Sequence, residues 1–449
     1  MSEKTRWSEI LKRVAGGLSG CSEESGTATV TGPEADHVVA RRGDRLSRMD
    51  ELRGDAVGEL LDAHERQRRT LLKAGGMYGA LAAAAPLLSP AMAAERATAK
   101  APGAAPKAPG GRLFDDKGGR VHVVESTKET TRWGIFDTTL PNILEIDSGD
   151  VLSFPNTWMH YLNQLKRGLP ISEIVALRLS KPGVGPHTVI GPIGVRGAEP
   201  GDVLEVQYLR LVTADWGTCF NNPGKVGTGA LADVFADGEV MYLDIDTRKR
   251  TARFSPEITL PVAPFQGILG VAPPDDFLPT PPGYAQGVVS SVPPGPHAGN
   301  VDCREAVVGS RVFIPVFKPT AKIFTGDTHA LQGDGEVNLS ALETSAKEMR
   351  VRVILHKKVD WKWPIHETPT AWLVHGMDKD LNLAFRIALL NAIDFLNRRA
   401  GLSRLDAYAL CSMGVSFRVT QVVDVNKGVY GMIPKSIFHP RLRSSIRVA

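Results

Sequence analysis

The stretch AEPGDVLEVQYL, residues 198–209, carries the pattern that decides the fold. Its Glu-Pro-Gly-Asp segment is a strong turn signal, and the residues after it alternate between apolar and polar types, as they do in a half-buried strand. A similar stretch, IDSGDVL, occupies residues 146–152. Two strand–turn–strand units of this form predict an antiparallel β-sandwich core.

Other segments extend this prediction along the chain. Alternation marks further strands around residues 121–123, 307–317 and 349–355, because side chains of a strand point to opposite faces in turn. Residues 261–296 are rich in Pro and Gly and are expected to form an irregular loop.

One long helix is expected late in the chain, over residues 381–400. Apolar residues recur there at helical spacing, Asp380 is a suitable N-cap, and Gly401 is a suitable residue just past the C-terminus. The fold class is therefore α+β, mainly β: an antiparallel β-sandwich core with a smaller α/β part and late helices.

Composition narrows the class of protein. With 43% hydrophobic and 23% charged residues, the chain of 449 residues is typical of a globular protein with a sizeable core. A net charge of +4 without a dense basic stripe argues against nucleic acid as a partner. None of the cysteines Cys21, Cys219, Cys303 and Cys411 forms a CxxC pair, so a finger-type zinc site is not expected.

The N-terminal region has the features of an export signal. The stretch QRRTLLK at residues 67–73 resembles the twin-arginine motif, an apolar segment follows over residues 74–88, and the small-residue pattern AMA precedes a cleavage position after Ala93. The apolar segment is too short and glycine-rich for a membrane span, so a signal peptide is expected. The protein would then be periplasmic or secreted, with membrane contact only in transit.

Four parts of the chain follow from these signals. Residues 1–93 form a leader and signal peptide, with Met49 as an alternative start, and residues 94–111 form a flexible linker rich in Ala, Pro and Gly. Residues 112–260 form an N-terminal β-rich domain, and residues 261–449 form a second β-rich, α+β part that completes the catalytic domain.

Candidate chemistry gathers in GDTHALQGDGE, residues 326–336. Asp327, Asp334 and Glu336 lie there with His329, and the glycines between them allow a tight loop. Such a loop can direct several oxygen and nitrogen donors to one point, as metal binding or water activation requires. The alternative is a solvated acidic turn, because Gly and Asp are common in turns.

Five blocks, in order, carry a resemblance to a known family. They are GPIGVRGAEPGD (191–202), GILGVAP (267–273), GNVD (299–302), QGDGE (332–336) and RVTQVVD (418–424). With these blocks the chain resembles the acetamidase/formamidase family from about Trp133 to Lys435. The resemblance implies hydrolysis of linear amides with release of ammonia, a fold that contains a β-sandwich, and homo-oligomers. Ala298, Ser416 and Phe417 depart from the family pattern, which affects the expected substrate more than the reaction.

Metal-activated water is the leading mechanistic hypothesis. The chain has no Gly-x-Ser-x-Gly elbow, and none of its cysteines lies in a nitrilase-like context. Asp302, Asp327 and His329 are the first candidate ligands, followed by His187. A His/Asp set with an open position suits Zn²⁺, whereas an all-oxygen set would indicate Ca²⁺. A divalent metal and a small amide substrate are therefore expected.

Four residues are candidates for the catalytic steps. Glu336 is the first choice for the general base, Asp334 is the second, and Glu367 is a further candidate because the family commonly has a Glu there. Asn300 could orient the amide through its own carboxamide. A turn cap or a backbone hydrogen bond is the structural alternative for each carboxylate. The alternative function is a non-catalytic β-sandwich module that binds a small ligand or carbohydrate, although aromatic residues for a carbohydrate platform are few.

Overall fold

A computed structural model of the chain describes residues 114, 117–222, 224–277 and 280–449. The expected leader and signal peptide (1–93), the alternative start at Met49 and the linker (94–111) lie outside the described residues.

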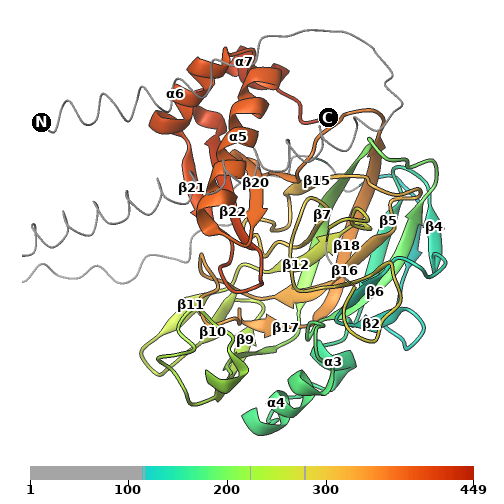
Figure 1. Cartoon of the computed structure of the whole chain (residues 1–449), viewed down its shortest axis with the longest axis vertical. Coiled ribbons are helices and arrows are strands. Elements are labelled where there is room, and N and C mark those ends of the chain that lie inside the picture. Colours follow the sequence, from blue (N-terminus) through green and yellow to red (C-terminus); the bar gives the residue numbers. More distant parts are fainter. Residues whose placement is uncertain (1–113, 115–116, 223, 278–279) are drawn as a thin grey trace, which may run out of the picture. The chain divides into compact units, whose positions relative to one another are not determined.

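Two large sheets dominate the described part of the chain (Figure 1). The nine-stranded sheet has the order β1 (Val121–Val123), β5 (Val151–Pro155), β18 (Ala346–His356), β7 (Val203–Thr213), β15 (Arg311–Pro315), β19 (Ile365–Glu367), β20 (Ala371–Asp378), β22 (Lys427–Pro434) and β21 (Ser416–Val419).

The eleven-stranded sheet branches at β16. Its main path is β11 (Thr259–Pro261), β10 (Thr251–Arg253), β9 (Glu239–Asp246), β8 (Trp216–Asn221), β17 (Glu343–Thr344), β16 (Ile323–His329), β12 (Phe265–Gly270) and β14 (Ala298–Asn300). Beside β16 runs β6 (Thr188–Val195), which also pairs with β2 (Thr131–Trp133) and β4 (Leu144–Ile146). A small sheet pairs β3 (Ile135–Asp137) with β13 (Val288–Ser290).

The main hydrophobic core lies between the two large sheets. Phe154 and Leu204 enter it from the nine-stranded sheet, and Ile193 and Phe265 enter it from the other, all of them fully buried. Each such side chain contributes about 1.5–3 kcal/mol to the free energy of folding relative to an exposed one. Most strand pairs are antiparallel, so the predicted antiparallel β-sandwich, in a mainly β chain, is confirmed.

The two strand–turn–strand units each cross from one sheet to the other. The first joins β4 to β5, and the second joins β6 to β7. The units are arranged alike, because β4 and β6 pair with each other while β5 and β7 both pair with β18. In each turn an aspartate accepts a hydrogen bond from the backbone three residues earlier: Asp150 from Asp147 at 3.1 Å and Asp202 from Glu199 at 2.9 Å. The repeated Gly-Asp therefore forms the corners of the sandwich.

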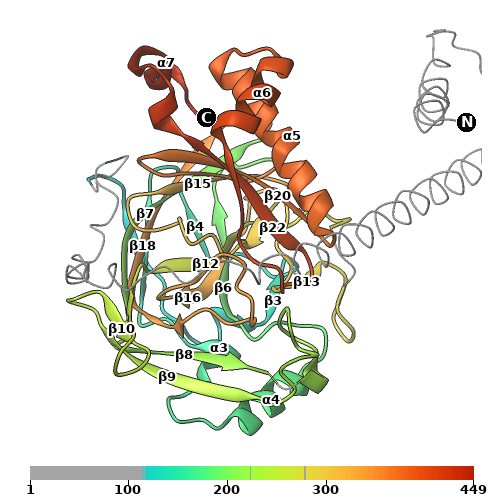
Figure 2. The same cartoon turned by 90° about the vertical axis from the view of Figure 1, so that its left-hand side faces the viewer.

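The late helices pack against one end of the nine-stranded sheet, where Figures 1 and 2 show α5 beside β20 and β22. As predicted, α5 (Leu381–Ala400) begins after Asp380, which accepts from two backbone N–H groups, and ends at Gly401 with φ of 71°. It is followed by α6 (Arg404–Gly414) and α7 (Pro440–Ser445).

Shorter helices lie elsewhere in the described chain. They are α3 (His160–Asn163), α4 (Ile171–Ser180) and the 3₁₀ turns Gly224–Val226 and Lys435–Ile437. Within the described ranges, no helix combines the length and apolar character that crossing a membrane requires.

One expectation for the central part of the chain is wrong in part, although most of the described residues there lie outside helices and strands. Residues 261–296 were expected to be irregular, but they contain β12 and β13. Every residue of β12 is buried, so its sequence lacks the alternation that marks a half-buried strand. Strands from before and after residue 260 also interleave in both large sheets. The segments 112–260 and 261–449 are therefore successive parts of the chain that build the same sandwich.

Candidate active site

Strand β16 positions the first part of the site, because two different strands pair with successive parts of one of its edges. It pairs with β6 as far as Gly326 and with β17 from Thr328 onward. Asp327 lies at the change and has φ of 62°, an uncommon conformation that Asp tolerates better than most residues. At this fork the side chains of Asp327 and His329 meet Glu343 of β17 and His187, which directly precedes β6.

The second part of the site comes from the other side of β12. Asp302 follows β14, has φ of 53°, and lies across Gly267 from β16. A Cβ on Gly267 would come within 2.5 Å of Oδ2 of Asp327 and 2.6 Å of Oδ1 of Asp302. Because glycine has no side chain at this position, the two carboxylates can face each other above β12.

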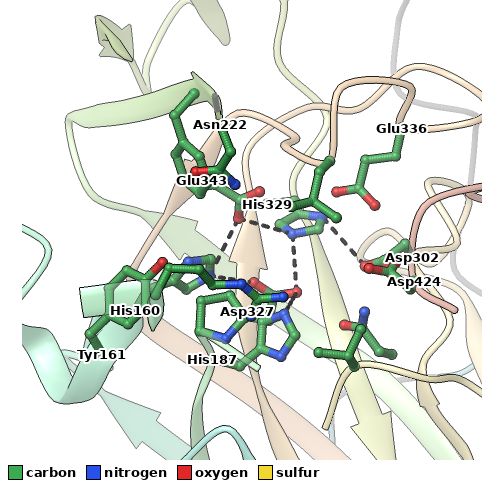
Figure 3. A pocket seen from close by; sticks show the side chains of 16 residues that line it. His160, Tyr161, His187, Asn222, Asp302, Asp327, His329, Glu336, Glu343 and Asp424 are labelled. Atoms are coloured by element: carbon green, nitrogen blue, oxygen red, sulfur yellow. Dashed lines mark hydrogen bonds and ion pairs between the residues drawn. The ribbon is translucent and has the colours of Figure 1, made fainter. Parts of the chain in front are cut away.

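Together these elements enclose a buried pocket (Figure 3). It has about 20 Å³ of free volume, which is space for little more than one water molecule. Five carboxylates and three imidazoles line it, with one arginine: Asp302, Asp327, Glu336, Glu343, Asp424, His160, His187, His329 and Arg178. The other lining residues are Tyr161, Pro186, Phe220, Asn222, Val292, Asn300 and Leu339.

His329 is held in one tautomer by Gln332. The amide nitrogen of Gln332 donates to the backbone oxygens of Asp302 and Thr420, so its Oε1 must accept from Nδ1 of His329 at 3.0 Å. Nε2 then faces Oδ2 of Asp327 and Oε2 of Glu343, each at 3.1 Å. A lone pair opposite two carboxylate oxygens is unfavourable, so a proton or a metal cation belongs at this point.

The carboxylates set the charge of the neighbouring imidazoles. Burial alone would lower the pKa of His329, but the charges of Asp327 and Glu343 raise it well above its ordinary value. The same balance raises the pKa of His160, whose Nε2 lies 2.8 Å from Oδ1 of Asp327. Burial would raise the pKa of Asp327, and the nearby imidazoles instead hold it well below the usual range.

The pKa of His187 is shifted in the opposite direction. Burial lowers its pKa to about 3, so the ring is neutral. Its Nδ1 lies 2.7 Å from Oγ of Ser291, and its Nε2 lies 3.9 Å from Oδ2 of Asp327. A neutral imidazole fixed by a hydrogen bond on one nitrogen is in the form that binds metals through the other.

A second cluster consists of Asp302, Glu336 and Asp424. Their carboxylate oxygens lie within 4.8 Å of one another, and all three side chains are buried. Burial, reinforced by like charges, raises the pKa of Asp302 and of Glu336 well above normal and that of Asp424 to about 7. Three carboxyl groups so close cannot all be ionised without a cation, so some of them hold protons near neutral pH.

The donor set fits a divalent metal ion. Both carboxylate oxygens of Asp302 and Oδ2 of Asp424 are buried and accept no hydrogen bond from any described residue. Buried polar atoms normally have partners, and carboxylates combined with one or more imidazoles are typical ligands of Zn²⁺. Three overlapping groups have this character: Asp302, Asp327 and His329; His160, Asp327 and Glu343; and His329, Glu336 and Glu343.

Six of the eight residues proposed from the sequence line this pocket: His187, Asn300, Asp302, Asp327, His329 and Glu336. The other two lie elsewhere. Asp334 is partly exposed and forms a two-pronged ion pair with Arg418, with bonds of 2.8 Å. Glu367 accepts from Arg311 at 2.8 Å and from Lys435 at 2.6 Å. Because cations already bind both carboxylates, neither is part of the catalytic scheme proposed below.

Sequence reasoning missed three lining residues with strong chemistry. Glu343 reaches the pocket only because β17 pairs with the end of β16. His160 begins α3, and Asp424 lies between β21 and β22. Asp424 closes one of the five family blocks, which was the one signal available for it. For Glu343 and His160 the sequence contains no comparable pattern.

The fold and the pocket together define a β-sandwich enzyme with a buried carboxylate–histidine site. The chain belongs to the Acetamidase/Formamidase family, whose model matches residues 124–281 and 283–440. The resemblance inferred from the five sequence blocks is therefore confirmed. Family membership places the chain among the amidases, enzymes that act on linear amides.

Individual relatives agree with this assignment. The chain is 28% identical to a formamidase of Methylophilus methylotrophus over 321 residues, covering 57% of this chain and 78% of the relative. It is 26% identical to an acetamidase of Mycolicibacterium smegmatis over 281 residues, covering 47% of this chain and 69% of the relative.

Solved structures show the same fold. A predicted acetamidase/formamidase from Thermoanaerobacter tengcongensis is similar with a TM-score of 0.61 and 25% identity, covering 73% of this chain and 99% of that one. An acetamidase from Bacillus halodurans gives a TM-score of 0.61 and 26% identity, covering 70% of this chain and 98% of that one.

Proposed function

We propose that the protein hydrolyses a small linear amide and releases ammonia, using a water molecule activated by a bound divalent metal ion. The observation that carries the proposal is the convergence of Asp302, Asp327, His329 and Glu336 in one buried pocket. Two relatives are a formamidase and an acetamidase, so formamide and acetamide are the first substrates to test. The pocket's small free volume of about 20 Å³ argues against long amides.

Asp327, His329 and Glu343 are the residues that would hold the ion, with Asp302 beside them. One imidazole among carboxylates favours Zn²⁺, while Ca²⁺ would prefer an all-oxygen set. A divalent ion in such a site lowers the pKa of water towards neutrality and offers a positive charge to the amide oxygen. His160 contributes through its hydrogen bond to Asp327, which orients that carboxylate.

The chain's own groups supply the proton transfers and the orientation. Glu336 acts as the general base: it takes a proton from the attacking water and later gives it to the departing nitrogen. Burial and the charge of Asp424 raise the pKa of Glu336. A bound cation would offset these like charges, so that Glu336 would be ionised before it takes the proton. Oδ1 of Asn300 is buried and accepts no hydrogen bond from a described residue, so it is available to accept from the substrate NH₂ group.

Ammonia release tests this proposal. Purified protein is incubated with formamide, acetamide and longer amides, and ammonia is measured for the wild type, Glu336→Gln and Asp334→Asn. Asp334 is a matched control because it lies in the same loop but is paired with Arg418. We expect a loss of about 10²–10⁴-fold for Glu336→Gln and activity within a few-fold of the wild type for Asp334→Asn. Absence of ammonia from every amide, or an equally active Glu336→Gln protein, would contradict the proposal.

We propose further, from the sequence, that the enzyme is exported through the twin-arginine pathway and forms homo-oligomers. Replacing Arg68 and Arg69 by lysine should leave the protein in the cytoplasmic fraction, whereas the unaltered precursor should yield periplasmic or secreted protein cleaved after Ala93. Cytoplasmic retention of both forms would contradict export. Sedimentation of the purified protein gives its oligomeric state, and a monomer at all concentrations would contradict self-association.

A further inference from the structure

A separate cluster of metal-ligating side chains lies outside the pocket. Cys303, His366 and His375 each present a donor atom, and these atoms lie within 4.8 Å of one another. All three residues are buried, with exposed fractions of 2%, 3% and 0%. None of them lines the amidase pocket, and none has a part in the proposed amide hydrolysis.

Strand pairing brings the two histidines together. His366 of β19 pairs with Leu373 of β20, and His375 lies two residues further along β20. The two side chains therefore point to the same face of the sheet as diagonal neighbours, and Leu373 places that face towards the sandwich core. Cys303 reaches the same core from the loop after β14, so three separate segments supply the donors.

Hydrogen bonding leaves this cluster incompletely satisfied. Nδ1 of His366 lies 2.8 Å from Nε2 of His375, which accounts for one proton between two nitrogens. Nδ1 of His375 is buried and has no partner among the described residues. Sγ of Cys303 lies 3.8 Å from Oε2 of Glu305, a long contact even for a thiol. Buried donors and acceptors with such poor partners are uncommon in native proteins.

The protonation states suit metal binding. Burial lowers the pKa of His366 to about 3 and that of His375 well below its ordinary value, so both rings are neutral and can act as ligands. The Cys303 thiol would give up its proton when a metal ion replaces it. Glu305 lies beside the thiol, held by Arg418 at 2.6 Å and Tyr430 at 2.7 Å.

We propose that Cys303, His366 and His375 bind a Zn²⁺-class transition-metal ion in a structural site separate from the amidase pocket. Two imidazoles and a thiolate are characteristic ligands of such ions. A tetrahedral ion holds two nitrogen ligands about 3.3 Å apart, so the rings need to separate by only about half an ångström from their present 2.8 Å. The thiolate would offset one of the ion's two positive charges.

The position of Cys303 gives this site a structural consequence. It directly follows Asp302, a pocket residue with φ of 53°, and Asn300 of the same loop also lines the pocket. An ion that joins Cys303 to β19 and β20 would fix the backbone that presents Asp302. Metal loading should therefore raise the melting temperature of the protein as well as occupy the site.

Cobalt spectroscopy distinguishes this site from the pocket. The purified full chain is stripped of metal and titrated with Co²⁺, which gives a near-ultraviolet charge-transfer band only where a thiolate is a ligand. Cys21→Ser, Cys219→Ser and Cys411→Ser are matched controls, and Cys411 is as buried as Cys303. We expect a band that corresponds to one thiolate-bound Co²⁺ per chain, complete within two equivalents because the pocket also takes up Co²⁺, in the wild type and all three controls. We expect its loss in Cys303→Ser.

Two outcomes overturn the proposal. One is a folded wild-type protein that takes up Co²⁺ without a thiolate band, a result that does not depend on any variant folding. The other is a band that persists in Cys303→Ser and disappears in one of the controls. His366→Gln keeps the thiol and should weaken Co²⁺ binding at the band-forming site about tenfold or more. Ammonia release is measured separately, so failure of the amidase proposal would leave this result unaffected.

Discussion

Gly267 lies across from Asp327 on the paired strands β12 and β16, and a Cβ at Gly267 would come within 2.5 Å of the Asp327 carboxylate. The same Cβ would meet Asp302 at 2.6 Å. The absence of a side chain at this one position is therefore what allows carboxylates from both sides of β12 to share the pocket.

Gly267→Ala should consequently reduce ammonia release by at least about 10²-fold, because a displacement of about 1 Å at reacting groups costs that much. The added methyl group should also reduce the free energy of unfolding by about 1–3 kcal/mol through overpacking. Gly333→Ala is the control, since a Cβ there meets nothing within 4 Å. Kinetics and thermal melts of both variants check the prediction, and a fully active Gly267→Ala enzyme would show that the two carboxylates need not face each other.

Glu343→Gln tests whether Glu343, on β17 beside the end of β16, is part of the site. Replacing this carboxylate by its neutral isostere removes one of the two negative charges that face Nε2 of His329 at 3.1 Å. We expect kcat to fall by about 10²–10³-fold and the metal content of the purified protein to fall with it. Glu348→Gln is a control on β18, the next strand along the chain, where the carboxylate pairs with exposed arginines. Unchanged activity and metal content in Glu343→Gln would remove Glu343 from the site.

Chelation tests the role of the metal directly. Dialysis against a strong chelator should abolish ammonia release, and Zn²⁺ should restore it, because the carboxylate oxygens of Asp302 and Oδ2 of Asp424 are buried in the pocket without a hydrogen-bond donor among the described residues. The Cys303→Ser protein should respond in the same way, since its thiol lies outside the pocket. Full activity in protein that elemental analysis finds free of metal would exclude metal-activated water.

The sequence predicted those elements that depend on residues close together in the chain. The helix 381–400 was found with both caps because capping and helical spacing act within a few residues. Asp327 and His329 were found because they stand two apart in one loop–strand segment. Glu343 was not found, because its place beside His329 arises from pairing between β16 and β17. Sheet register depends on contacts that are distant in sequence, which a pattern within one segment does not encode.

Contacts distant in sequence also explain why two of the candidate carboxylates lie outside the pocket. Glu367 resembled a catalytic base by its position in the family pattern, yet Arg311 and Lys435 bind it from neighbouring strands and turns. Asp334 shares a loop with Glu336, but its side chain forms an ion pair with Arg418 outside the pocket. In both cases the deciding partner is remote in sequence, so spacing alone could not separate a catalytic carboxylate from a paired one.

Arg311 also contacts Glu205, and this pair predicts how stability responds to acid. Burial alone would raise the pKa of Glu205, but the hydrogen bond from His356 and the charge of Arg311 lower it to about 2. Because the folded-state pKa is depressed, Glu205 stabilises the fold fully above its ordinary pKa of about 4.5. That contribution is lost as the pH falls from about 4.5 to about 2. It amounts to about 3 kcal/mol.

Comparison of the wild type with Glu205→Gln isolates this contribution from other acid-titrating groups. At pH 7 the variant should be less stable by a few kcal/mol, because Arg311 loses one of its two partners. The stability gap should narrow steadily as denaturant unfolding is repeated at pH 5, 4 and 3, since the wild-type carboxylate becomes protonated while glutamine does not change. Glu239→Gln, at an exposed position of β9, should show no gap at any pH. A Glu205→Gln gap that stays constant from pH 7 to pH 3 would mean that Glu205 does not titrate with a depressed pKa, and that its effect is one of packing alone.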